Sequence, residues 1–219
     1  GQADKLFIGE YLTLADFGLY NIAFFLASFP YLMGAMVMGR VLIPVTRQNP
    51  PGDSTANFAR YRRFRLAALA VLLVMAAWLA FAGPWLIGVM YDPRYQGAAG
   101  IVVMIAAVQA PGLVILTCDQ VALARGDSRR FFWLTLARGL AVACGIWVGL
   151  DLGGLWGALI GLGAANLLTY PVLVWLLRPH GAWDPLADVA AFVAGAVIFV
   201  SALWYNAEAV ARLAMMQPG

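Results

Sequence analysis

Long apolar runs separated by short polar segments dominate the residue pattern of this chain. A helix that crosses a bilayer needs about 20 apolar residues. Six runs meet this requirement, at 17–39, 66–91, 95–123, 131–150, 154–177 and 189–207. We therefore predict an all-α polytopic membrane helix bundle with about six complete transmembrane helices. Residues 1–10 read as the end of a truncated helix that begins upstream, and residues 208–219 as either a terminus or the start of another helix.

Four of the predicted helices contain a proline, and at the first three of these prolines we expect a bend or a break. Proline removes one backbone hydrogen bond, and membrane bundles tolerate this when neighbouring groups satisfy the freed carbonyl. Pro30 lies near the middle of the first helix, and Pro84 lies late in the second. Pro111 interrupts the third helix, and Pro171 lies in the fifth.

Arginine residues concentrate in segments that fall on one side of the membrane in this arrangement. Segments 40–65, 125–130 and 178–188 together hold ten arginines, whereas the opposite side holds only Arg94 and Arg212. Cytoplasmic loops are enriched in Lys and Arg, so we expect loops 40–65, 125–130 and 178–188 to be cytoplasmic. A basic loop of a soluble, nucleic-acid-binding protein is the alternative, and the length of the flanking apolar runs argues against it. Contact with anionic lipid headgroups is a secondary role for these arginines.

The overall composition agrees with a membrane protein. The 219 residues are 63% hydrophobic and 11% charged, whereas soluble domains have about 25% charged residues. Thirteen of the fourteen basic residues are arginine, which fits a high-GC bacterium. Cys118 and Cys144 lie in apolar runs and are interpreted as small packing residues.

Small residues recur at every fourth position in the fifth predicted helix. Gly153, Gly157 and Gly161 are followed at the same spacing by Ala165. Such a stripe lets another helix approach closely. We interpret it as a packing surface rather than a ligand site.

Charged residues inside the predicted helices are the candidates for function, because charge in a membrane is costly and usually faces a polar cavity. Asp119 and Arg138 lie about 9 Å and about 12 Å from the arginine-rich surface at 1.5 Å per helical residue. We predict that they pair or share a polar cavity. The alternative is that Arg138 alone extends to the headgroups. Further candidates for the lining of a substrate cavity are Asp4, Lys5, Asn21 and Asn166.

The sequence offers no arrangement typical of catalysis, metal binding or cofactor binding. The one histidine, His180, lies in a polar loop, and Gly161-Leu162-Gly163 lies inside a membrane helix rather than after a strand. We therefore predict a protein that is not an enzyme and has no metal or cofactor.

Several short motifs occur in a consistent order between residues 4 and 129. They are DKLFIG at 4–9, GLYNIA at 18–23, VLIP at 41–44, YDPRY at 91–95 and ARGDSR at 124–129. In order and spacing the chain resembles the C-terminal half of polysaccharide (O-antigen type) flippases, which belong to the multidrug/oligosaccharidyl-lipid/polysaccharide exporter superfamily. The shorter members of that family would end near Arg178, so the additional apolar run favours a longer member or a truncated tail.

The resemblance implies a transporter of the bacterial inner membrane, with two lobes around a cavity that opens alternately to either face. Residues 1–219 would form the second lobe as a single transmembrane domain, with the missing N-terminal lobe as its partner. The implied substrate is an undecaprenyl-linked oligosaccharide, whose pyrophosphate would meet Arg138 and Lys5. The alternatives are a drug or lipid II exporter of the same superfamily, a membrane-embedded enzyme of envelope polysaccharide assembly, and a structural membrane subunit.

Overall fold

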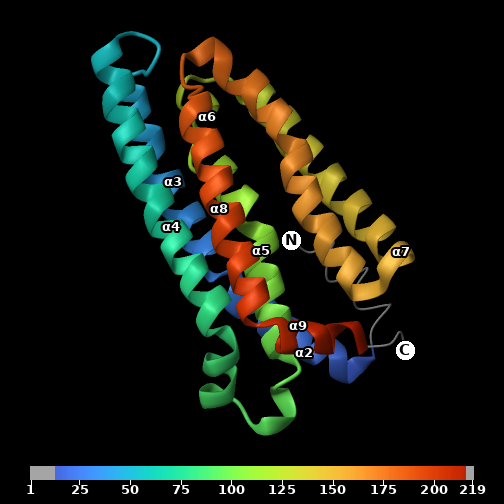
Figure 1. The fold of residues 1–219 in the computed structure, drawn as a ribbon. Helices are drawn as coiled ribbons and strands as arrows, with labels where there is room; N and C mark the ends of the chain where they lie inside the picture. Colours follow the sequence, from blue (N-terminus) through green and yellow to red (C-terminus); the bar gives the residue numbers. More distant parts are fainter. Residues whose placement is uncertain (1–12, 216–219) are drawn as a thin grey trace.

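The computed structural model describes residues 13–215, and within that range the chain forms helices and no strands (Figure 1). This confirms the predicted all-α bundle. The elements in chain order are α2 Leu14–Ala27, α3 Phe29–Gln48, α4 Thr55–Met90, η1 Pro93–Tyr95, α5 Ala98–Leu116, α6 Val121–Ala124, α7 Ser128–Leu177, η2 Arg178–His180, α8 Pro185–Tyr205, α9 Ala207–Ala211 and η3 Arg212–Met215.

Five segments of the described chain are long and apolar enough to cross a membrane. They are Phe29–Gln48, Thr55–Met90, Ala98–Ala124, Ser128–His180 and Pro185–Tyr205. A shorter apolar helix, Asp16–Ala27, precedes them. By the length and composition of these helices, the protein is a multi-pass membrane protein.

The predicted bend at Pro30 is present as a break between α2 and α3 at Ser28. Pro30 has no N–H to donate to the carbonyl four residues earlier. Helix α2 therefore ends at Ala27. At this end the Ser28 N–H donates to the Phe24 carbonyl at 2.9 Å. The predicted interruptions at Pro84 and Pro111 are wrong, because α4 and α5 continue through both prolines. In a packed bundle the loss of one backbone hydrogen bond does not end a helix.

The predicted loop 40–65 is also shorter than expected. Helix α3 ends at Gln48 and α4 begins at Thr55, so residues 49–54 alone connect the two helices. The Ser54 hydroxyl caps α4 by accepting the Asn57 N–H at 3.1 Å. Arginine is a good helix former with a long apolar stem. The apolar run therefore ends before its helix does, which explains the error.

The connections within the three arginine-rich segments lie together at one end of the bundle, as predicted. Arg125 lies 3.8 Å from Asp53, and His180 lies 3.4 Å from Asp127. We call the connections 49–54, 125–127 and 178–184 the basic end, which is at the top of Figure 1. The opposite, far end comprises 91–97, 151–154 and 206–215. The assignment of the basic end to the cytoplasm stays a prediction.

Helix α7 is a hairpin of two arms that turn at Gly153 and Gly154. Gly154 has φ +58°, a conformation that glycine adopts without strain. The turn lies within a residue of the predicted one, and the arms are residues 128–152 and 155–177. The predicted glycine stripe packs against the first arm of the same hairpin. Its contacts there are two further glycines, with Gly157 against Gly149 and Gly161 against Gly145.

Helix α5 lies at the centre of the bundle and is buried along most of its length. Its neighbours are α2, α4, α7 and α8. The side chains of Ile101, Ile105 and Leu113 are almost fully buried in the apolar core. Because of this central position, the polar residues that α5 and its following turn carry lie inside the protein.

Candidate functional site

The predicted pair of Asp119 and Arg138 is present in the structure. Asp119 lies in the turn between α5 and α6, and Arg138 lies on the first arm of α7. The Arg138 Nη1 lies 3.7 Å from the Asp119 Oδ2. Asp119 is 4% exposed, and the Gln120 Nε2 donates to its other carboxylate oxygen at 3.1 Å. Arg138 therefore points into the bundle rather than towards the lipid headgroups.

The turn that carries Asp119 satisfies its own backbone, which allows it to lie inside the protein. The N–H groups of Cys118 and Asp119 both donate to the Ile115 carbonyl, at 3.1 and 3.0 Å. The Thr117 hydroxyl donates to the Val114 carbonyl at 2.8 Å. Asp119 is therefore held by a compact turn directly after the central helix.

The remaining N–H groups of Arg138 are not satisfied by the described part of the protein. The Arg138 Nε and Nη2 are buried, and neither has a hydrogen-bond partner among residues 13–215. The Arg138 Cζ lies 5.9 Å from the centre of the Tyr31 ring, at the edge of cation–π range. A buried donor without an acceptor costs about 1–3 kcal/mol, and more when it is charged. The guanidinium is thus suited to an acceptor that enters from outside.

Arg138 lines a pocket of about 230 Å³ between the α2–α3 break, α5 and the α7 hairpin. We call this cavity the Arg138 pocket. Gln109 Nε2 donates to the Ser28 hydroxyl at 3.0 Å across it. The other lining residues are Phe24, Tyr31, Leu32, Val142, Leu162 and Asn166. The pocket therefore combines one cation with amide, hydroxyl and phenol groups on an apolar wall.

Of the other residues that we predicted to line a substrate cavity, Asn166 alone is found at the Arg138 pocket among residues 13–215. Asn166 lines the Arg138 pocket and donates through its Nδ2 to the Leu162 carbonyl at 3.1 Å. The Nδ2 of Asn21 donates to the Phe17 carbonyl of its own helix at 2.9 Å, and Asn21 is not among the residues that line the pocket. Asp4 and Lys5 lie outside the described residues.

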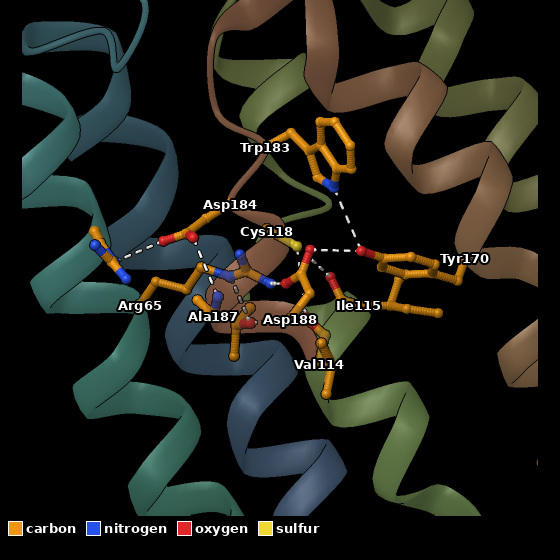
Figure 2. A network of polar contacts seen from close by, with 11 residues as sticks. Arg65, Val114, Ile115, Cys118, Tyr170, Trp183, Asp184, Ala187 and Asp188 are labelled. Atoms are coloured by element: carbon orange, nitrogen blue, oxygen red, sulfur yellow. Dashed lines mark hydrogen bonds and ion pairs between the residues drawn. The ribbon is translucent and has the colours of Figure 1, made fainter. Parts of the chain in front are cut away.

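A second polar cluster lies near the basic end and joins α4, α5, α7 and α8 (Figure 2). Arg65 on α4 forms an ion pair with Asp188 on α8, and their side chains are 2% and 0% exposed. The other Asp188 oxygen accepts the Tyr170 hydroxyl at 2.8 Å, and the Trp183 indole donates to that hydroxyl at 3.3 Å. The Arg65 Nε donates to the Thr117 hydroxyl at 3.3 Å. We call these five residues the Arg65 cluster.

The Arg65 cluster positions the turn that carries Asp119. Thr117, which accepts from Arg65, is two residues before Asp119. Next to the cluster, the Arg62 Nε lies 2.7 Å from the Asp184 carboxylate, whose second oxygen caps α8 by accepting the Ala187 N–H at 3.1 Å. These contacts fix the ends of α4 and α8 against the turn, and hence support the carboxylate that faces Arg138.

The sequence reasoning missed Arg65 and Asp188, because it placed both in polar loops. The signal was the helical spacing of the residues around them. Arg65 falls in the buried stripe of α4, which comprises Tyr61, Arg65, Leu69, Leu72 and Ala76. Asp188 begins the corresponding stripe of α8, which comprises Asp188, Ala191, Gly195, Phe199 and Ala202.

Comparison of the chain with protein-family models, with curated proteins and with solved structures gives no match. The resemblance to polysaccharide flippases therefore rests on the short motifs of the sequence. The function has to be argued from the geometry of the Arg138 pocket together with those motifs.

Proposed function

We propose that the chain forms one lobe of a transporter that moves a lipid-linked oligosaccharide across the bacterial inner membrane by alternating access. The observation that carries the proposal is Arg138, a cation inside the membrane bundle whose Nε and Nη2 have no acceptor among residues 13–215. Charged groups at membrane depth usually mark a substrate or ion path. The basic end would face the cytoplasm.

The chemistry of the Arg138 pocket suits the polar part of such a substrate. A guanidinium binds phosphate oxygens through two parallel N–H groups. Ser28, Gln109 and Asn166 offer hydroxyl and amide groups that can bond to sugar hydroxyls. Asp119 holds the guanidinium from one side, which leaves the other nitrogens for the phosphate. The hydrocarbon tail of the substrate would stay in the bilayer.

The surface around the pocket supports a second lobe as its other wall. Phe25, Phe29 and Leu32, which surround the break between α2 and α3, are 69%, 47% and 44% exposed. Lipid or protein can cover such residues. Because Leu32 also lines the Arg138 pocket, we propose that an upstream lobe covers this face and completes the cavity. The described lobe alone is then not expected to transport.

The test is an Arg138→Gln substitution at the chromosomal locus, in the full-length protein of the bacterium that makes it. We expect surface polysaccharide to fall about tenfold or more and its lipid-linked precursor to accumulate, because a charged hydrogen bond of about 1.5–3 kcal/mol is lost. Arg138→Lys keeps the charge and should retain part of the activity. Arg129→Gln is the matched control, because Arg129 is an exposed arginine on the same helix outside the pocket.

The level of each variant in the membrane has to be measured by immunoblot, because Arg138→Gln leaves Asp119 buried without its cation. The Arg138→Gln, Asp119→Asn double variant removes that imbalance and should still not transport. Normal surface polysaccharide after a clean deletion of the gene would overturn the proposal. Accumulation of the peptidoglycan precursor instead would indicate a lipid II exporter.

A further inference from the structure

A separate groove with two arginines lies on the α7 hairpin at the basic end. It has a volume of about 500 Å³ and lies between the start of the first arm and the end of the second. Pro171, Val174 and Trp175 form its apolar wall, and Arg130 and Arg178 lie on the side nearest the basic end. None of these residues lines the Arg138 pocket. We call this cavity the hairpin groove.

Both arginines of the hairpin groove are held in place by tryptophan rings. The Arg130 Cζ lies 4.9 Å from the centre of the Trp175 ring, and the Arg178 Cζ lies 4.5 Å from that of Trp183. A guanidinium stacked on an aromatic ring keeps its N–H edge free for an anion. The two cations are therefore preorganised at the groove.

The charge of this arginine pair is only partly balanced by the protein. Arg130 has one acidic neighbour, Asp127, whose carboxylate lies 3.5 Å from its Nε. Arg178 has no ion-pair partner among residues 13–215. The groove therefore has a net positive charge at one end and an apolar wall along its length. Trp175 is 46% exposed on that wall, as is usual for tryptophan at a membrane interface.

We propose that the hairpin groove binds one anionic glycerophospholipid from the leaflet at the basic end. Its phosphate would lie between Arg130 and Arg178, and one acyl chain would lie along Pro171, Val174 and Trp175. Basic pockets between membrane helices bind anionic headgroups in this way. The apolar wall favours a lipid over a free phosphate ion, because an acyl chain can cover that wall and a phosphate ion cannot. This binding does not depend on the transport proposed for the Arg138 pocket.

The test is native mass spectrometry of the purified full-length protein in detergent, titrated separately with phosphatidylglycerol, phosphatidylcholine and inorganic phosphate. We expect a one-to-one adduct with phosphatidylglycerol. In the Arg130→Gln, Arg178→Gln double variant the affinity for phosphatidylglycerol should fall about thirtyfold, since each arginine near a headgroup contributes about 1 kcal/mol. Arg129→Gln is the control, because Arg129 is exposed and adjacent in sequence but does not line the groove. It should bind as the unmodified chain does.

Three outcomes would overturn the inference. Equal binding of phosphatidylcholine would show that the arginines do not select the headgroup. Displacement of phosphatidylglycerol by millimolar inorganic phosphate would indicate a site for a free anion. An equal loss in Arg129→Gln would show that net charge, rather than the groove, holds the lipid. The Arg130→Lys, Arg178→Lys double variant keeps both charges and should retain most of the binding. It therefore shows whether the loss in the double glutamine variant comes from the missing charges or from misfolding.

Discussion

Arg65 and Arg138 are both cations inside an apolar bundle, but the protein satisfies their N–H groups to different degrees. Arg65 pairs with Asp188 and also donates to Thr117, and of its three nitrogens only Nη1 lacks a partner among residues 13–215. Arg138 has a single ion contact at 3.7 Å and two buried nitrogens without a partner among residues 13–215. The difference assigns them different roles. Arg65 stabilises the arrangement of helices, and Arg138 is available to a ligand.

Arg65→Met is expected to destabilise the protein strongly, because it leaves the Asp188 carboxylate fully buried without its cation. Breaking one side of a buried ion pair costs about 3–5 kcal/mol, whereas replacing both sides with apolar groups is often neutral. The Arg65→Met, Asp188→Leu double variant should therefore unfold at a higher temperature than Arg65→Met alone. The measurement is the midpoint of thermal unfolding in detergent, followed by tryptophan fluorescence.

The control for this experiment is Arg63→Met, two residues earlier on the same helix. Arg63 is exposed and has no ion-pair partner among residues 13–215. An exposed substitution of this kind changes stability by at most about 0.5 kcal/mol, so it should shift the midpoint little. If the losses of the two single variants at Arg65 and Asp188 simply add in the double variant, the two side chains do not act as a pair.

At the scale of elements, the α7 hairpin depends on direct contact between two helix backbones. A Cβ atom built on Gly157 would meet the Gly149 carbonyl, and one built on Gly161 would meet the Gly145 carbonyl. In a membrane, helices associate through such close packing, because lipid tails remove most of the hydrophobic driving force. The hairpin carries Arg138, Asn166 and both arginines of the hairpin groove, so its closure places residues of both sites.

Gly157→Ala is expected to separate the arms of the hairpin and to lower stability by about 1–3 kcal/mol, the usual cost of overpacking. The added methyl group would meet backbone rather than a flexible side chain, so relief requires the arms to move. Gly139→Ala is the control on the same helix. Apart from the neighbouring backbone of its own helix, no described atom lies within 4 Å of its added Cβ, and removing a helical glycine should stabilise by about 0.5–1 kcal/mol. Thermal unfolding of both variants in detergent would compare them, and equal shifts would contradict the close contact.

The sequence predicted the helices well but not their ends. Apolar runs identify the part of a helix that lies in the hydrocarbon, yet α3 and α4 extend past it into their arginines, up to Gln48 and from Thr55. The positions of the prolines were also unreliable predictors of helix breaks. Pro30 coincides with a break two residues earlier, whereas α5 continues through Pro111. Whether a proline ends a helix depends on neighbours that the local sequence does not specify.

The sequence predicted those parts of the candidate site that depend only on the position of a residue along its helix. Asp119 and Arg138 flank one short connection, so their depths follow from helical rise alone. The contributions of Ser28 and Gln109 to the Arg138 pocket depend on how α2 and α5 are rotated against each other. That rotation is set by packing. Arg65 could have been found by its place in the buried stripe of α4, because helical spacing places it in register with Leu69.

At the scale of the whole molecule, charge divides the bundle into two unlike ends. The three connections of the basic end contact one another through Asp53, Arg125, Asp127 and His180. Segments 40–65, 125–130 and 178–188, which contain these connections, hold ten arginines, whereas the far end has Arg94 and Arg212. The cytoplasmic segments of membrane proteins carry such an excess of arginine. The orientation of the protein can therefore be tested independently of its substrate.

We expect an impermeant maleimide to label the far end from outside the cell and the basic end only after lysis. In a background with Cys118→Ala and Cys144→Ala, single cysteines at Asp92 and at Asp151 should react in intact spheroplasts, whereas one at Asp53 should not. Asp53 and Asp92 are 55% and 58% exposed, so access to the reagent rather than burial decides the result. Asp151 also tests the hairpin, because only a turn at Gly153 and Gly154 places it on the same side as Asp92. Labelling of Asp53→Cys before lysis would reverse the orientation, and would place the arginines of the hairpin groove in the outer leaflet.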